Sequence, residues 1–223
     1  MYGVADTAVA VHLYGESTAR ISVAGARLTL TQQGDYPWAD TVTIRLGLDH
    51  AARFALHLRV PDWAGEATLA LNGGAAAATK VDAAGYLTLD RDWADGDSVT
   101  LHMPMAARVM VPHPRIKADT GRVALMRGPL VYCAEGADNG ADLDMMTLPA
   151  RLTDVQTARV AELGAAVAFD VPTLVDSDTA WGNLMYVATP PPAQTAVRRF
   201  IPYHLWDNRS PGEMRVWVRR AVE

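Results

Sequence analysis

Apolar and polar residues alternate with a period of two along most of this chain. The alternation is clearest in residues 41–48, where Val42, Ile44, Leu46 and Leu48 fall on one side, and it recurs in residues 26–32, 53–60, 68–71, 86–90 and 98–103. Successive side chains of a β-strand point to opposite faces, so this pattern places the apolar side chains on a core face. Strands about 10–15 residues apart, with Gly, Asp and Asn between them, are typical of a sandwich or barrel. The sequence therefore predicts an all-β fold.

The connections between these segments contain turn-forming residues. Gly25 tolerates a positive φ and can close a tight hairpin, and Asn72-Gly73-Gly74 is a strong turn signal for the same reason. One segment, Asp154–Gly164, has apolar residues at roughly helical spacing, and we predict a short helix there.

A domain boundary is expected near Val111-Pro-His-Pro-Arg, because two prolines in three residues cannot donate the hydrogen bonds of a sheet. We predict two consecutive antiparallel β-sandwich (jelly-roll-like) domains, residues 1–111 and 112–223. The strands expected in the second domain are residues 122–126, 130–133, 166–171, 183–187, 197–201 and 214–218. Thr189-Pro-Pro-Pro is expected to be a stiff, extended connector.

The charge and composition disfavour several kinds of partner. The formal net charge is −5, and the basic pairs Arg198-Arg199 and Arg219-Arg220 read as solvated strand edges, so nucleic acid is not expected to bind. No apolar run approaches the roughly 20 residues that cross a bilayer, so no membrane partner is expected. No signal peptide is visible, and residues 8–14 already read as a strand, which suggests a chain cut from a longer protein. The single cysteine fits a reducing cytoplasm without excluding export.

Side chains that could perform chemistry do not form a recognisable motif. Cys133 lies in an apolar strand-like run and is expected to be a buried, inert thiol. Asp90, Asp92, Asp95 and Asp97 are expected to cap the backbone N–H groups of a turn. Asp142 and Asp144 have the spacing of a calcium-binding loop, but the other ligands of such a loop are missing. The six histidines lack zinc-site spacing, and no nucleotide-binding or hydrolase motif is present.

Aromatic residues are the most suggestive candidates for a binding surface. Trp38, Trp63 and Trp206 lie near predicted strand ends. Exposed Trp and Tyr rings can stack on the apolar face of a sugar, which makes carbohydrate a candidate ligand. The alternative interpretation is that large rings with one polar atom close the ends of a sandwich core.

Several segments together resemble the region that follows the catalytic domain in glycoside hydrolase family 127, the β-L-arabinofuranosidase family. The most specific is Arg-Gly-Pro-Leu-Val-Tyr-Cys at 127–133. The others include Val11-His-Leu-Tyr, Gly34-Asp-Tyr-Pro-Trp, Leu58-Arg-Val-Pro-Asp-Trp, Leu71-Asn-Gly, Gly85-Tyr-Leu-Thr-Leu, Ile201-Pro-Tyr-His-Leu-Trp-Asp-Asn-Arg and Gly212-Glu-Met-Arg-Val-Trp. The resemblance extends over essentially all 223 residues.

The resemblance implies an α/α-barrel catalytic domain followed by two β-sandwiches. It also implies a cysteine nucleophile at a zinc site and a glutamate acid/base, all in the barrel and outside this sequence. Cys133 matches a sandwich cysteine of the family, so no catalytic residue, zinc ligand or other cofactor is assigned to this chain.

We therefore expect a non-catalytic portion whose partner is the barrel, with Trp38 and Trp63 in that contact and an apolar patch exposed on the isolated chain. The alternatives are a free-standing carbohydrate-binding module, and an enzyme with two opposed carboxylates about 5–10 Å apart.

Overall fold

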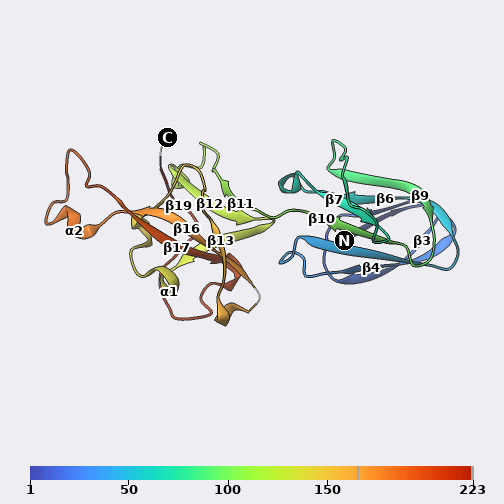
Figure 1. Cartoon of the computed structure of the whole chain (residues 1–223). Coiled ribbons are helices and arrows are strands. Elements are labelled where there is room, and N and C mark those ends of the chain that lie inside the picture. Colours follow the sequence, from blue (N-terminus) through green and yellow to red (C-terminus); the bar gives the residue numbers. More distant parts are fainter. Residues whose placement is uncertain (165, 222–223) are drawn as a thin grey trace. The chain divides into compact units, whose positions relative to one another are not determined.

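The computed structural model describes residues 1–164 and 166–221, and the chain forms two compact units, Met1–Met105 and Ala106–Glu223 (Figure 1). The division thus falls six residues before the boundary expected at 111/112. The physical reason is that β11 (Ala107–Met110) pairs with β12 (Arg122–Arg127) and belongs to the second unit. Pro112 and Pro114 follow this strand and end it, as proline requires, but they do not separate the units.

The first unit consists of two sheets. The first sheet has the order β1 (Tyr2–Ala5), β2 (Ala8–Val11), β6 (Ala52–Arg59) and β9 (Tyr86–Trp93). The second has the order β3 (Ser17–Val23), β4 (Ala26–Gln33), β5 (Thr41–Leu48), β10 (Ser98–His102), β7 (Thr68–Leu71) and β8 (Ala77–Ala78). A short 3-10 helix, η1 (Asp62–Ala64), follows β6. The paired strands are antiparallel except β2 and β6, which run parallel.

Both sheets contribute to one core in the first unit. Val9 and Leu56 come from the first sheet, Leu30 and Ile44 come from the second, and all four side chains are buried in the same cluster. Alternate residues of β5 are buried, as the period of two predicted. Each fully buried aliphatic side chain of this kind stabilises the fold by about 1.5–3 kcal/mol.

The β3–β4 hairpin turns as the sequence predicted. Ala24 and Gly25 form its two-residue loop, with φ values of 48° and 80°. Two positive φ values give the twist that matches a right-handed β-ribbon, and glycine adopts one without a steric penalty.

The strands of the second unit form one sheet that closes on itself. Its strands are β11, β12, β13 (Leu130–Glu135), β14 (Met146–Leu148), β15 (Gln156–Arg159), β16 (Val167–Val175), β17 (Gln194–Pro202), β18 (Met214–Arg215) and β19 (Val218–Arg220). The closure occurs at β12, which pairs with β19 through Arg122 and Val123 and with β13 through Met126 and Arg127. A strand that changes partners along its length makes a corner, so the strands enclose the core in a continuous ring. The prediction of an all-β protein is confirmed.

Short helical turns connect these strands. They are η2 (Lys117–Asp119), α1 (Gly136–Asn139), η3 (Leu143–Met145), η4 (Ala161–Leu163), α2 (Asp178–Trp181) and η5 (Tyr203–Leu205). The main core inside the ring includes Tyr132 and Phe169, whose ring centroids are 4.9 Å apart. The buried Tyr132 hydroxyl donates a hydrogen bond to the Val167 carbonyl at 2.7 Å, so its polar atom is satisfied.

The helix predicted at Asp154–Gly164 is wrong. Residues 156–159 form β15, which pairs with β16 from Gln156 opposite Asp170 to Arg159 opposite Val167, and only the three residues of η4 are helical. The edge of β16 offers backbone partners for these residues, and that tertiary pairing outweighs an imperfect helical pattern.

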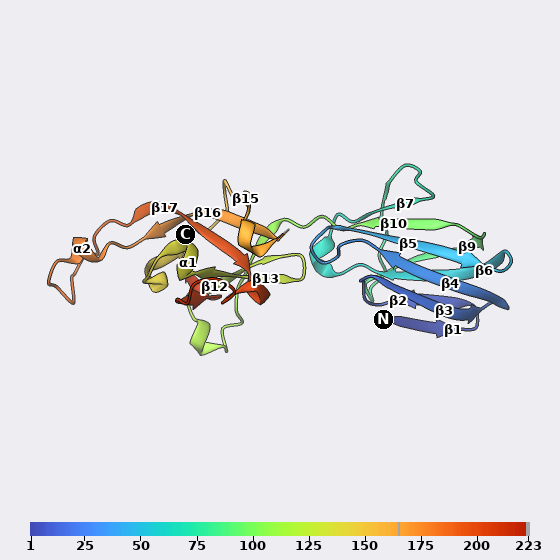
Figure 2. The same ribbon diagram turned by 90° about the horizontal axis from the view of Figure 1, so that it is seen from below.

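The strand predicted at 183–187 is also wrong. The ladder between β16 and β17 ends where Val175 pairs with Gln194, and residues 176–193 form the loop that contains α2. Figures 1 and 2 both show this loop reaching beyond the rest of the second unit. Leu184, Met185 and Tyr186 form the hairpin tip, where they are 63%, 83% and 93% exposed. With no neighbouring strand at the tip, their apolar character cannot produce a sheet.

Candidate functional site

The three tryptophans expected at a binding surface lie in different settings. Trp38 is 42% exposed in the loop between β4 and β5, and Trp206 is 38% exposed at the end of η5 in the second unit. Trp63 lies in η1, half-buried against the core of the first unit. Within the first unit Trp93 fits the alternative interpretation, because it is buried and its Nε1 donates to the Phe54 carbonyl at 3.0 Å. A role for Trp38, Trp63 or Trp206 in a domain contact or in sugar stacking stays a prediction.

Two of the four acids predicted to cap a turn do so, because Asp95 and Asp97 lie between β9 and β10 and bind backbone groups. For the other two the prediction is wrong, since Asp90 and Asp92 lie in β9 and pair with Arg53. Asp95 accepts a hydrogen bond from the Leu48 amide at 2.9 Å, and Asp97 accepts one from the Ala94 amide at 3.0 Å. The backbone donor at Ala94 is the main reason that the pKa of Asp97 lies below its ordinary value. These carboxylates stabilise a turn.

Asp144 is held by arginines. Its Oδ2 accepts a hydrogen bond from Arg215 at 2.8 Å, and its Oδ1 lies 3.4 Å from Nη1 of Arg122. The hydrogen bonds from Arg215 are the largest cause of the lowering of its pKa to about 2. The described residues contain no group of three or more His, Cys, Asp or Glu side chains that could hold a metal ion.

Cys133 is completely buried in a small cluster with Val160, Ala168 and Ile201, as the sequence predicted. Burial, reinforced by the nearby Glu135 carboxylate, raises the pKa of its thiol to about 12. A thiol with so high a pKa is protonated at neutral pH and is a poor nucleophile.

A buried ion-pair cluster anchors the loop that follows η5. Arg209 donates to Asp138 at 2.9 and 2.5 Å and also to Glu135. The remaining oxygen of Glu135 accepts a hydrogen bond from the Asp207 amide at 2.7 Å. The side chains of Arg209, Glu135 and Asp138 are 12%, 7% and 9% exposed, so this cluster ties the loop to β13 and α1 away from solvent. No pattern in the sequence indicated this cluster.

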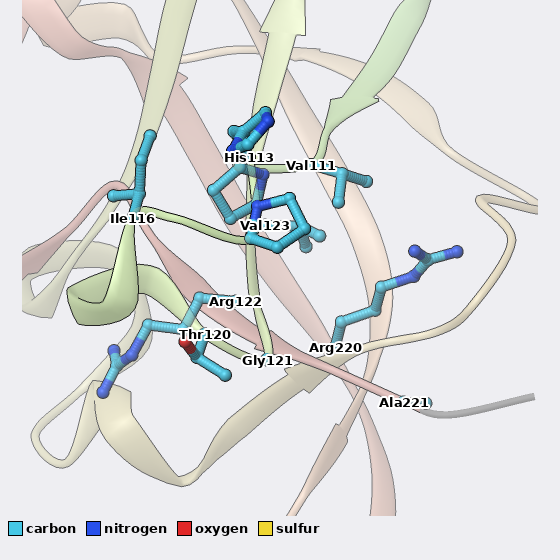
Figure 3. Close-up of a pocket in the computed structure, with 11 residues that line it drawn as sticks. Val111, His113, Ile116, Thr120, Gly121, Arg122, Val123, Arg220 and Ala221 are labelled. Carbon is cyan, nitrogen blue, oxygen red and sulfur yellow. The ribbon is translucent and has the colours of Figure 1, made fainter.

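A hollow of about 510 Å³ lies in the second unit, and Figure 3 shows the residues that line it. Val111, Pro112, Pro114 and Ile116 give it a mainly apolar lining. The guanidinium groups of Arg122 and Arg220 point away from each other in this view, so they do not converge on a ligand (Figure 3). The hollow lacks the convergent polar groups that orient a bound small molecule.

A second hollow, of about 560 Å³, combines aromatic and charged side chains. We call it the aromatic groove. Its lining includes Asp119, Arg122, Tyr203, Met214, Arg215 and Trp217. The sequence analysis named the neighbouring Trp206, but the residues that line the groove are Tyr203 and Trp217. The only signal in the sequence for these two residues was that they belong to the segments 201–209 and 212–217, which carry part of the family resemblance.

Comparison with known proteins identifies the family. The model of the middle domain of family 127 β-L-arabinofuranosidases matches residues 8–105, and the model of the family's C-terminal domain matches residues 107–219. The chain belongs to glycoside hydrolase family 127. The two matched regions coincide closely with the two compact units.

Individual members of family 127 agree with this assignment. The chain is 34% identical over 204 residues to a non-reducing end β-L-arabinofuranosidase of Bifidobacterium longum, covering 86% of this chain and 30% of that protein. The crystal structure of Ara127N, a GH127 β-L-arabinofuranosidase from Geobacillus stearothermophilus T6, is 33% identical and superposes with a TM-score of 0.90 over 99% of this chain and 35% of that one. A further glycoside hydrolase structure is 31% identical, with a TM-score of 0.84, and the chain covers 37% of it. The chain therefore spans about a third of the length of these relatives.

No helix among the described residues is long and apolar enough to cross a membrane.

Proposed function

We propose that this chain is the non-catalytic β portion of a family 127 glycoside hydrolase and supports an α/α-barrel domain that hydrolyses terminal arabinofuranosides. The observation that carries the proposal is the pair of consecutive family matches, to a middle domain and then to a C-terminal domain. The relatives are longer single chains, and two of them are β-L-arabinofuranosidases by name.

The chemistry of the described side chains supports a structural role. Cys133 carries a protonated, buried thiol, and the carboxylates of Glu135 and Asp138 are bound by Arg209. Hydrolysis of a glycoside needs an acid and a nucleophile or base with access to the sugar. Groups already committed to buried ion pairs do not offer that access.

The exposed apolar side chains support a contact with another domain. A monomeric protein seldom exposes a large contiguous apolar patch, and such patches commonly mark interaction sites. The hairpin tip places Leu184, Met185 and Tyr186 together in solvent at the end of the β16–β17 loop. We assign this tip, together with Trp38 and Trp63, to surfaces that contact the barrel.

An activity assay with a complementation arm tests the proposal. The purified 223-residue chain should not release chromophore from a nitrophenyl arabinofuranoside. Mixing it with the separately produced barrel domain of the Geobacillus relative should raise that domain's melting temperature and its activity. Turnover by the chain alone, or a barrel domain that neither binds the chain nor responds to it, would refute the proposal.

A variant in which all three residues of the hairpin tip become serine probes the contact surface. These side chains are solvent-exposed, so the stability of the second unit should change by no more than about 0.5 kcal/mol. Binding of an apolar dye by the isolated chain, and its self-association in light scattering, should both decrease. An unchanged dye signal would show that the tip is not the exposed patch.

A further inference from the structure

The aromatic groove has the composition of a small-molecule site. Two stretches that are distant in sequence supply most of its walls. The first has Asp119 in η2 and Arg122 at the start of β12, and the second has Tyr203 in η5 and Arg215 and Trp217 in the β18–β19 region. Its volume of about 560 Å³ lies within the range of ligand sites in proteins, roughly 300–1,000 Å³. Tyr203 is 43% exposed, so the ring is accessible to a ligand.

The loop that begins at Tyr203 is held rigidly. Four and six residues further along the chain, Asp207 donates its amide to Glu135, and Arg209 forms buried ion pairs with Glu135 and Asp138. A binding residue whose surroundings are fixed in advance loses little entropy when a ligand arrives. The buried ion-pair cluster therefore stabilises the fold and also fixes the loop that carries Tyr203 in position for a ligand.

The charges around the groove compensate one another. Arg122 and Arg215, which line the groove, share the Asp144 carboxylate behind them, with distances of 3.4 and 2.8 Å. Asp119 supplies a carboxylate to the lining itself. Two arginines and two aspartates give a formal sum of zero, and Glu213, whose charge also acts on Arg215, adds a further negative charge. An anion would meet guanidinium groups whose charge is already neutralised, whereas a neutral ligand rich in hydroxyl groups could use both the N–H donors and the carboxylate acceptors.

We infer that the aromatic groove binds a neutral sugar residue, with the ring of Tyr203 against the apolar face of the sugar and Arg215 and Asp119 bonded to its hydroxyl groups. A sugar matches both the aromatic and the charged side chains of this lining, because one face of a pyranose or furanose carries C–H groups while its rim carries hydroxyls. The site is non-catalytic, and its existence does not depend on the role proposed for the chain beside a barrel.

Titration of the ¹⁵N-labelled chain with arabinotriose, xylotriose and cellotriose tests this inference by NMR. We expect saturable shifts of the Trp217 indole and of the amides around Tyr203 with at least one sugar, with Kd of roughly 1 mM, the affinity expected of a shallow open site. Inorganic phosphate should not produce them. The absence of saturable shifts with all three sugars, or shifts caused by phosphate instead, would overturn the assignment.

Two aromatic variants locate the site. Tyr203→Ala should weaken sugar binding about tenfold, while Tyr203→Phe, which keeps the ring, should bind within about twofold of the wild type. Tyr186→Ala is the matched control, since Tyr186 is an exposed aromatic residue of the same unit that does not line the groove, and it should leave sugar binding by the isolated chain unchanged. The inference is wrong if Tyr203→Ala binds the sugar as tightly as the wild type. If Tyr203→Ala unfolds, the sugar-induced shifts of the wild type decide, and shifts that map away from the groove contradict the inference.

Discussion

Replacing Arg209 with methionine should destabilise the second unit strongly. Arg209 forms ion pairs with two buried carboxylates: Nη1 and Nη2 lie 2.9 and 2.5 Å from the oxygens of Asp138, and Nη2 also donates a hydrogen bond to Glu135. Methionine keeps much of the side-chain length without the guanidinium group. The variant therefore leaves Glu135 and Asp138 facing each other without the charge that compensates them.

The expected loss follows from the burial of the three side chains, which are 12%, 7% and 9% exposed. Removing one partner of a buried ion pair costs about 3–5 kcal/mol, because an uncompensated charge remains in a poorly solvated place. The second unit has about 120 residues, for which 1 kcal/mol corresponds to roughly 4 °C in melting temperature. We therefore expect Arg209→Met to lower the melting temperature of this unit by about 12–20 °C.

Hydrogen exchange of individual amides, recorded at increasing temperature, measures the stability of each unit separately. Amides of residues 106–221 should lose protection in Arg209→Met, while those of residues 1–105 keep theirs. The matched control is Arg53→Met in the first unit, whose ion pair with Asp90 is 63% and 58% exposed and should be worth less than about 1 kcal/mol.

A neutral version of the cluster separates charge from packing. Combining Arg209→Met with Glu135→Gln and Asp138→Asn removes the unpaired charges and should recover much of the lost stability. A fall of less than about 3 °C in Arg209→Met would refute the reasoning, and so would a triple variant no more stable than the single one.

Two further predictions concern the pKa values of Asp144 and Cys133. The pKa of Asp144 is lowered from 3.8 to about 2, so its interactions stabilise the fold above about pH 4 and are lost as the pH falls from 3.8 towards 2. Arg215→Gln removes the largest cause, and a carboxyl NMR titration should then place the pKa closer to 3.8; a value still near 2 would contradict this account. Cys133, with its pKa raised to about 12 by burial, should resist alkylation by iodoacetamide at pH 8 in the native chain and react within minutes in denaturant. Rapid native labelling, compared with a Cys133→Ser control, would show that the thiol is accessible.

Local pattern was sufficient to predict much of the fold. The alternation in residues 41–48 depends only on the geometry of an extended backbone, and β5 buries the predicted side chains. The Ala24-Gly25 turn follows from the freedom of one glycine, and the buried Cys133 follows from the apolar run around it. The family resemblance also followed from the sequence, because an ordered set of segments, above all residues 127–133, is specific even where each segment is weak.

Tertiary pairing decided what the local pattern could not. Residues 156–159 are a strand because β16 lies beside them, and the hairpin tip is irregular because no strand does. Asp119, Arg122, Tyr203 and Trp217 form one groove only after η2, β12, η5 and the chain beyond β18 come together. The sequence alone determined which side chains are buried in a core and which residues form turns. Which charges neutralise one another depends on distances between residues far apart in the chain, and only the folded structure sets those distances.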